Sequence, residues 1–292
     1  MELGWKRKVE ELVDHALAED WAWGDVTTQA LIPAEAEGQA SFIAKSAGVV
    51  AGIEVVHLVF ARVDPSLKFR ELLHDGDKLQ RGTEIAAVEG RVGSILRGER
   101  VALNFLQRLS GIATETSRYV EAVRGTKARI VDTRKTTPGL RFLEKYAVKA
   151  GGGQNHRVHL GDGILIKDNH LAALRARGLD VKAVIDLAKK NAPHTLKIEI
   201  EVTTVAEAGE AVEAGADIVM LDNMSVEEMR RAVKSVGGRV LVEASGGITL
   251  DNVRSVAETG VDLISVGALT HSVKALDISL ELEVLPHQGP AL

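Results

Sequence analysis

Six short hydrophobic runs recur through the second half of the chain, and this repetition restricts the possible folds more than any other feature. Segments with helical patterns, such as residues 204–215 and 225–237, lie between most of the runs. Buried strands separated by helices are typical of parallel βα units. The predicted strands are residues 128–133, 163–168, 196–202, 217–222, 239–244 and 262–267. The pattern therefore predicts an α/β barrel or a doubly wound sheet.

The first part of the chain follows a different pattern. Strand-like runs at 39–52 and 83–96 alternate with turn signals such as His-Asp-Gly-Asp at 74–77, which is typical of an α+β domain with an antiparallel sheet. Residues 1–20 have the pattern of an amphipathic helix, and residues 98–125 that of a long helix broken or bent near Gly111.

The change of pattern predicts two domains. We assign residues 1–115 to an N-terminal α+β domain and residues 116–274 to the α/β domain, with a boundary uncertain by about ten residues. The C-terminal segment, residues 275–292, is expected to join the N-terminal domain.

Composition excludes several classes of protein. The 292 residues carry a formal net charge of −5 and have a pI near 6.0, which argues against a general nucleic-acid binder. No apolar run approaches the length of a membrane span, and the N-terminus does not have the pattern of a signal peptide, so we expect a cytoplasmic protein without a membrane partner. The absence of cysteine excludes thiolate nucleophiles, and any metal must bind through oxygen or imidazole.

One segment departs from the acidic average. Between Arg134 and His170 the basic residues outnumber the acidic ones, which predicts a pocket for a small anion. The basic residues are Arg134, Lys135, Arg141, Lys145, Lys149, Arg157 and Lys167, and the acidic ones are Glu144, Asp162 and Asp168. For Arg141, Lys145 and Lys149, which fall at helical spacing, a solvated helix face is the preferred interpretation.

Polar residues and a glycine stand at the ends of nearly all the predicted strands. They are Asp132, Lys167, Glu201, Asp222, Glu243 with Ser245, and Gly267. In parallel barrels the catalytic groups collect at the C-terminal ends of the strands. Helix capping explains Asp132, Asp168 and Asp222 equally well when each is taken singly, but it explains Lys167 and Glu201 poorly. We therefore expect one cavity that holds charges of both signs.

Two kinds of group in this cavity could bind anions. The runs at 244–248 and 265–269 place small residues after the last two strands, where barrel enzymes frequently bind phosphate through backbone N–H groups. Cationic side chains form the second kind, and guanidinium groups suit carboxylates. They are Arg134, Lys135, His156, Arg157 and Lys167. His156 is either a donor to a carboxylate or a structural residue of its loop, and Gly151, Gly152 and Gly153 allow either a tight turn or a hinge.

These segments resemble the quinolinate phosphoribosyltransferase family, also called decarboxylating nicotinate-nucleotide pyrophosphorylases. The matching runs are EDWAWGDVTT at 19–28, GERVALN at 98–104, LSGIAT at 109–114, DTRKTTPGLR at 132–141, KYAVKAGGGQNHR at 145–157, LIKDNH at 165–170, IEIEV at 198–202, MLDN at 220–223, ASGGI at 244–248 and VGALTHS at 266–272. Because so many runs occur in one order along nearly the whole chain, the resemblance is specific.

The resemblance implies a fold and an activity. The fold would be an N-terminal α+β open sandwich and a C-terminal incomplete α/β (TIM-like) barrel, in a homodimer with a shared active site; assembly into hexamers is left open. The activity would be transfer of phosphoribosyl from phosphoribosyl pyrophosphate to quinolinate with decarboxylation, giving nicotinate mononucleotide, CO2 and pyrophosphate for NAD biosynthesis. Mg²⁺ would be needed and no organic cofactor.

The resemblance also implies residue roles. Arg134, His156, Arg157 and Lys167 would hold the carboxylates of quinolinate, with Arg100 supplied by the neighbouring subunit. Lys135, Glu201 and Asp222 would contact phosphoribosyl pyrophosphate and would be catalytic, and Thr133 would be a further substrate-binding residue. Mg²⁺ would bind mainly through the pyrophosphate, with Glu201 and Asp222 as candidate ligands. Ser245, Gly246, Gly247, Ser265 and Gly267 would receive the 5′-phosphate.

Three alternatives stay open. The first is a related phosphoribosyltransferase that acts on another planar acid, such as nicotinate. The second is a barrel lyase that uses Lys167 as a base or Schiff-base amine. The third is a non-catalytic sensor of phosphorylated sugars, which could keep the glycine runs but would not need Glu201 and Asp222.

Overall fold

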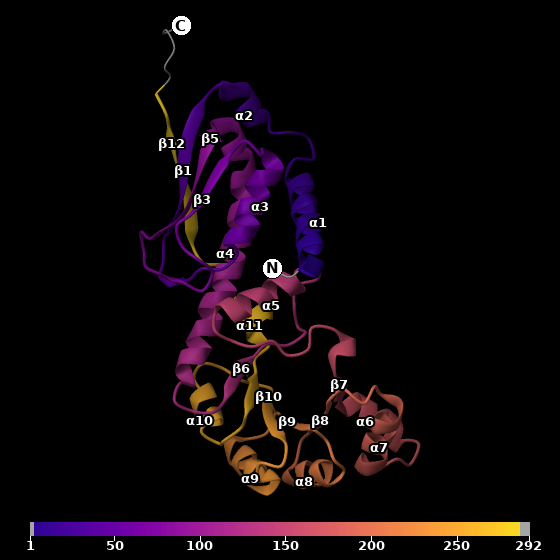
Figure 1. Cartoon of the computed structure of the whole chain (residues 1–292). Coiled ribbons are helices and arrows are strands. Elements are labelled where there is room, and N and C mark those ends of the chain that lie inside the picture. Colours follow the sequence, from indigo (N-terminus) through magenta and orange to yellow (C-terminus); the bar gives the residue numbers. More distant parts are fainter. Residues whose placement is uncertain (1–2, 287–292) are drawn as a thin grey trace. The chain divides into compact units, whose positions relative to one another are not determined.

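The computed structural model describes residues 3–286, which form two compact units (Figure 1). The first unit contains the chain up to Glu115, Thr137–Gly152 and the segment from Val273; the second contains Thr116–Thr136 and Gly153–Ser272. Residues 137–152 thus belong to the first unit, whereas the sequence division grouped them with the barrel. The division into folding domains stays a prediction.

An antiparallel sheet forms the first unit. Its strands lie in the order β12-β1-β5-β3. They are β1 (Glu37–Ala44), β3 (Lys68–Glu71), β5 (Glu84–Arg91) and β12 (Ile278–Val284), and a second small sheet pairs β2 (Gly48–Val49) with β4 (Lys78–Leu79). Side chains of β1 alternate between buried and more exposed positions, as expected for a strand with one face on a core.

Helices supply the other layer of this unit. They are α1 (Leu3–Asp20), α2 (Val26–Leu31), α3 (Ile53–Val63), α4 (Val92–Ala122), which continues into the second unit, and α5 (Arg141–Ala150). Phe60 of α3 packs edge-on against Phe42 of β1, with ring centroids 6.0 Å apart. Val9, Val13 and Leu17 are buried on α1, and this spacing of four confirms the predicted amphipathic helix.

Helix α4 corrects two predictions. It begins at Val92, so the run predicted as a strand over 83–96 ends at Arg91. The predicted break near Gly111 is wrong, because α4 continues through this residue. A Cβ atom on Gly111 would lie 2.3 Å from the carbonyl oxygen of Lys274. The glycine therefore permits a close approach of two backbone segments and does not interrupt the helix.

Helix α5 corrects a third prediction. The proposed solvated face of Arg141, Lys145 and Lys149 is wrong for Lys145, which is only 1% exposed. Lys149 is exposed and Arg141 is half-buried. Helical spacing places side chains on one face, but it does not show whether that face meets solvent.

A parallel sheet forms the core of the second unit. Its six strands lie in the order β6-β11-β10-β9-β8-β7 and confirm all six predicted strands. They are β6 (Arg129–Val131), β7 (Ile164–Ile166), β8 (Ile198–Val202), β9 (Ile218–Asp222), β10 (Leu241–Ser245) and β11 (Leu263–Ser265). Because β6 and β7 are the two edges of the sheet, the barrel is incomplete.

Helices follow the strands of this sheet. They are α6 (Asp168–Arg175), α7 (Val181–Asn191), α8 (Val205–Glu213), α9 (Val226–Val236), α10 (Val253–Ala257) and α11 (Ala268–His271), and a single 3₁₀ turn, η1, covers Leu160–Asp162. Helices α8 and α9 confirm the helical patterns at 204–215 and 225–237. None of the helices within residues 3–286 has a stretch long and apolar enough to cross a lipid bilayer.

Candidate active site

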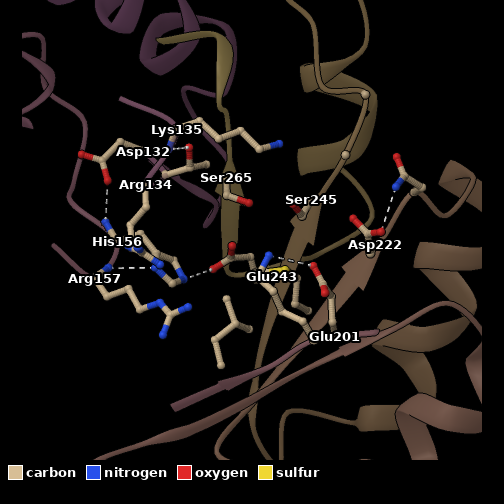
Figure 2. Close-up of a pocket in the computed structure, with 17 residues that line it drawn as sticks. Asp132, Arg134, Lys135, His156, Arg157, Glu201, Asp222, Glu243, Ser245 and Ser265 are labelled. Carbon is tan, nitrogen blue, oxygen red and sulfur yellow. Dashed lines mark hydrogen bonds and ion pairs between the residues drawn. The ribbon is translucent and has the colours of Figure 1, made fainter. Parts of the chain in front are cut away.

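The C-terminal ends of the parallel strands surround a cavity of about 480 Å³ (Figure 2). Most of the residues singled out in the sequence line it: Thr133, Arg134, Lys135, His156, Arg157, Lys167, Glu201, Asp222, Ser245, Gly246, Gly247 and Ser265. Asp132, Leu165, Met220, Asn223 and Glu243 complete the lining. Side chains that are more than a hundred residues apart in sequence thus meet at one cavity of mixed charge.

Two predicted site residues lie outside this lining. Gly267 lies two residues after the end of β11, and a Cβ atom built on it would be 3.2 Å from Cδ of Lys135, which does line the cavity. Arg100 belongs to the first unit, where its side chain is exposed on α4. Its role in the site of a neighbouring subunit stays a prediction.

Two guanidinium groups form the cationic wall of the cavity. Burial, together with the nearby charge of Arg134, lowers the pKa of Arg157. Nη1 of Arg157 donates to the carbonyl oxygen of Gly163 at 3.2 Å, while the buried Nε of Arg134 has no partner among the described residues. Two guanidinium groups that lie close together and have unused N–H donors are suited to bind a dianion.

Asp132 fixes the loop that carries His156 and Arg157. Its carboxylate accepts hydrogen bonds from Nδ2 of Asn155 at 2.6 Å and from the backbone N–H of His156 at 2.9 Å. Asp132 is fully buried, so the interpretation of this residue as a helix cap is wrong. Its carboxylate instead accepts hydrogen bonds from a side-chain amide and a backbone N–H of this loop.

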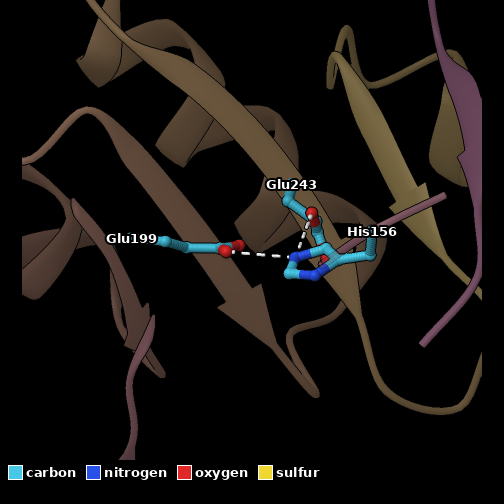
Figure 3. Close-up of side chains that lie close together, drawn as sticks. All are labelled: His156, Glu199 and Glu243. Carbon is cyan, nitrogen blue, oxygen red and sulfur yellow. Dashed lines mark hydrogen bonds and ion pairs between the residues drawn. The ribbon is translucent and has the colours of Figure 1, made fainter. Parts of the chain in front are cut away.

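Both ring nitrogens of His156 contact protein groups. Nδ1 accepts the backbone N–H of Arg157 at 2.8 Å, and Nε2 lies 3.1 Å from Oε2 of Glu199 (Figure 3). Nε2 is also 3.6 Å from Oε2 of Glu243. Of the two roles considered for His156, the apo geometry favours the structural one.

The rim of the cavity carries a cation and two carboxylates. Nζ of Lys167 lies 3.5 Å from Oε1 of Glu201, and Oδ2 of Asp222 accepts from Nδ2 of Asn223 at 2.8 Å. Asn223 has a φ of 52°, and it is the one non-glycine residue of positive φ in the described chain. Strained backbone of this kind persists where surrounding structure enforces it, often at functional sites.

Capping is also the wrong interpretation for Asp222 and Asp168. The helix after β9 is capped by Ser225, whose hydroxyl oxygen accepts from the N–H of Glu228. Asp168 lies inside the first turn of α6, and Lys167 occupies the cap position. The carboxylate of Asp222 is therefore available to the cavity, apart from its contact with Asn223.

The glycine run after β10 forms a left-handed turn on the cavity wall. Gly246 and Gly247 have φ values of 88° and 63°, and Asn252 fixes the turn by donating from Nδ2 to the carbonyl oxygen of Gly247 at 2.9 Å. A Cβ atom on Gly246 would lie 2.2 Å from Oδ1 of Asn223. The turn thus requires glycine and exposes backbone where an anion could bind.

Two buried glutamates of the site were given no role from the sequence. Glu199 was not singled out, and Glu243, which had been placed at a strand end, lies in the middle of β10. The signal was the run Ile-Glu-Ile-Glu-Val at 198–202, since alternate residues of a strand share a face. If Glu201 faces the barrel interior, Glu199 must do so as well.

Comparisons with known proteins show which family the chain is similar to. The family models for the N-terminal and C-terminal domains of quinolinate phosphoribosyl transferase match residues 25–110 and 112–281. A Bacillus subtilis (strain 168) protein, named probable nicotinate-nucleotide pyrophosphorylase (carboxylating), is 44% identical over 94% of this chain and 93% of its own. Quinolinate phosphoribosyltransferase (decarboxylating) 2, mitochondrial, of Nicotiana glauca is 43% identical over 94% of this chain and 82% of its own.

A solved structure extends the similarity to three dimensions. The crystal structure of NadC from Streptococcus pyogenes is 43% identical and superposes with a TM-score of 0.90, covering 95% of this chain and 97% of that chain. The two matched domain families, the identity along the chain and the shared fold lead to one conclusion: the chain belongs to the quinolinate phosphoribosyltransferase family.

Proposed function

We propose that the chain transfers the phosphoribosyl group of phosphoribosyl pyrophosphate to quinolinate and decarboxylates the product to nicotinate mononucleotide. The observation that carries the proposal is one cavity with two anion-binding walls. Arg134 and Arg157 form one wall, the turn at Gly246 and Gly247 forms the other, and the carboxylates of Glu201 and Asp222 belong to the same lining. Two anionic substrates and a developing cation can be accommodated together there.

Phosphoribosyl transfer explains why acids and cations share the cavity. When the bond from ribose C1 to pyrophosphate breaks, C1 gains oxocarbenium character and the leaving group is highly charged. Glu201 and Asp222 would stabilise the positive carbon, and Lys135 would neutralise the departing pyrophosphate. The turn at 246–247 and Ser265 would hold the 5′-phosphate, with Gly267 keeping Lys135 in place.

The carboxylates on the rim are suitable for Mg²⁺. Oxygen ligands of this kind are those that Mg²⁺ prefers, usually together with substrate phosphates, and Glu201 and Asp222 would hold the ion beside the pyrophosphate. When bound, Mg²⁺ would supply charge neutralisation for the leaving group. No organic cofactor is required for this chemistry.

Quinolinate would bind against the cationic wall. Arg134, Arg157 and Lys167 would hold its two carboxylates so that the pyridine nitrogen faces C1 of the ribose. After the nitrogen attacks C1, the ring carries a positive charge. This charge stabilises the electron pair that stays on the ring when the 2-carboxylate leaves as CO2.

The decisive experiment offers the purified protein quinolinate, phosphoribosyl pyrophosphate and Mg²⁺. We expect nicotinate mononucleotide, pyrophosphate and CO2 in equal amounts. Turnover of nicotinate in place of quinolinate would favour the related phosphoribosyltransferase. Borohydride trapping of a substrate on Lys167 would favour the lyase, and substrate binding without pyrophosphate release would favour the sensor.

The proposal includes a homodimer in which Arg100 of one subunit serves the cavity of the other. Arg100→Ala and Lys167→Ala should each have little activity alone at quinolinate concentrations below the wild-type KM. Mixing them should restore part of the activity, because one of the two sites in a mixed dimer is then intact. No recovery in dimers shown to have exchanged subunits would count against a shared site. A cytoplasmic location is part of the same proposal.

A further inference from the structure

Two cavities of the second unit share a set of lining residues. The second cavity, of about 370 Å³, is lined by the first residues of several strands, among them Arg129, Ile218 and Leu263. It therefore opens toward the N-terminal ends of the strands. Glu243 and His156 line both cavities, so they lie between the substrate cavity and a second opening.

The hydrogen bonds of His156 fix the position of its proton. Because Nδ1 accepts the backbone N–H of Arg157 at 2.8 Å, Nδ1 carries no proton, and the ring proton of a neutral imidazole must be on Nε2. Nε2 then donates to Oε2 of Glu199 at 3.1 Å. The single ring N–H is therefore used by the carboxyl group of Glu199.

Glu243 is left without a compensating donor. Its side chain is fully buried, and neither carboxyl oxygen has a hydrogen-bond partner within residues 3–286. Burial, reinforced by the charge of Glu199 and opposed by His156, raises the pKa of Glu243 to about 7. A buried carboxyl group without a partner is far less costly when protonated.

Nε2 of His156 lies 3.6 Å from Oε2 of Glu243, beyond hydrogen-bonding distance, and the strands packed around Glu243 supply no lysine or arginine in direct contact. Strand β8 contributes Glu199, strand β11 contributes the hydroxyl of Ser265, and strand β9 contributes the uncharged Met220. Cations are present in the cavities beyond: Arg157 lines both, and Arg129 lines the second. Glu243, at the floor of the cavity beneath Glu201 and Asp222, is therefore a carboxyl group that holds its proton up to about pH 7.

The proposed reaction consumes a proton that the previous steps do not provide. Loss of CO2 leaves an electron pair on ring carbon 2, which must become a C–H bond. Resting on the proposed function, we propose that Glu243 is the acid that protonates this carbon.

The step balances without a further reactant. The bond from carbon 2 to the carboxylate breaks and its electron pair stays on carbon 2, while CO2 leaves. The O–H bond of Glu243 breaks, its pair stays on oxygen, and the proton forms the new C–H bond. Glu243, now a carboxylate, regains a proton from water through the second cavity.

Other groups of the cavity are less suited to this step. The N–H of His156 points to Glu199, and Lys167 lies beside Glu201. A carboxylic acid near its pKa also releases a proton more readily than an ammonium group does. These comparisons single out Glu243.

A metal ion is the competing explanation for the same three side chains. Single atoms of His156, Glu199 and Glu243 lie within 4.8 Å of one another, but a ligating Nε2 would have to lose its proton. Because Nδ1 already accepts from the Arg157 N–H, that loss would leave an imidazolate. Proton storage requires no such change.

The test separates phosphoribosyl transfer from decarboxylation. In single-turnover experiments with Glu243→Gln, pyrophosphate release should stay within about threefold of wild type, whereas CO2 and nicotinate mononucleotide should form about 100-fold more slowly. Quinolinate mononucleotide should accumulate. Gln keeps the shape and neutrality of the protonated acid, and Glu210→Gln, the same change on an exposed residue of α8, is the matched control.

Glu199→Gln supplies an independent test. Removing the charge of Glu199 makes Glu243 lose its proton at lower pH, so the upper pH limit of decarboxylation should move down by about one unit. The upper limit of pyrophosphate release should not move with it.

Three results would overturn the inference: unchanged decarboxylation in Glu243→Gln, an equal loss of pyrophosphate release, or a stoichiometric metal in the wild-type protein that Glu243→Gln lacks. Failure of the proposed function looks different, because the wild-type protein itself would then release no pyrophosphate from quinolinate and phosphoribosyl pyrophosphate.

Discussion

Glu199 and Glu201 are two residues apart on β8, yet the protein treats their carboxylates in opposite ways. Glu201 stands at the rim, partly exposed, with Nζ of Lys167 3.5 Å away. Glu199 is buried one layer below and receives the N–H of His156. The rim, with Lys167, Glu201 and Asp222, thus pairs its acids with a partly exposed cation. The floor, with Glu199 and Glu243, has the single N–H of His156 for two acids.

This difference shows that the chemistry of a strand position depends on its depth in the barrel. The interior of such barrels is usually filled by branched apolar residues, and here the floor holds Glu199 and Glu243 instead. Burying two acids beneath a site for anions costs stability. We therefore infer that Glu199 and Glu243 are retained because Glu243 supplies a proton to the reaction. The residues of the rim are retained because they bind the two substrates.

The pH dependence of stability examines the floor directly. The unfolded chain ionises Glu243 near pH 4.5, but the folded protein keeps it protonated until its raised pKa of about 7. Between these values a rise in pH favours the unfolded state, so the free energy of unfolding should fall by about 3 kcal/mol from this group. Denaturant titrations at several pH values measure it.

The control for this prediction is Glu243→Gln, which has no proton to lose. Its free energy of unfolding should exceed that of wild type increasingly as the pH rises from 4.5 to 7, and the difference should then level off. A difference that does not vary with pH would mean that Glu243 is ionised in the folded protein.

The turn at Gly246 and Gly247 tests the rim with a matched pair. Gly246→Ala places a methyl group 2.2 Å from Oδ1 of Asn223 and strains a left-handed backbone; we expect it to lower the free energy of unfolding by about 2–3 kcal/mol and to raise KM for phosphoribosyl pyrophosphate. Gly247→Ala meets no atom within 4 Å and should cost only about 1 kcal/mol. Equal effects would show that Asn223 can move away.

The sequence predicted the rim better than the floor. Asp222, Lys167 and Glu201 were found because charged residues at strand ends interrupt a hydrophobic pattern. Glu199 and Glu243 lie within strands, where a single acid can face either solvent or the interior. Their burial depends on how the six strands curve around a common axis. The pattern along a single strand does not predict this curvature.

The same limit explains the errors in the first unit. Glycine at position 111 suggested a break in the helix. Its role is instead to allow the backbone of Lys274, which is far along the chain, to approach closely. The burial of Lys145 likewise follows from packing and not from spacing. The six parallel strands and the helices α8 and α9 depend on local patterns, and these were predicted correctly. The convergence at the rim was predicted from the general geometry of parallel barrels.

The effect of substitutions on pyrophosphate release also distinguishes the rim from the floor. Glu201→Ala and Lys135→Ala should each lower turnover at least about tenfold, roughly 1.4 kcal/mol in barrier. The loss should include pyrophosphate release, in contrast to Glu243→Gln, and the melting temperature should stay near wild type. Near-normal turnover in either variant would remove that residue from the catalytic role.

Lys167→Met should have the smallest effect on stability among these variants, and it should clearly raise KM for quinolinate. The Lys167 side chain is 46% exposed, and an exposed ion pair contributes only about 0–1 kcal/mol to folding, so the free energy of unfolding should change by less than about 1 kcal/mol. Because Lys167 would hold a carboxylate of quinolinate, KM for quinolinate should rise about tenfold or more, while KM for phosphoribosyl pyrophosphate changes little. If stability fell instead and KM for quinolinate did not change, Lys167 would be a structural partner of Glu201, and the rim would resemble the floor in being held together by its own charges.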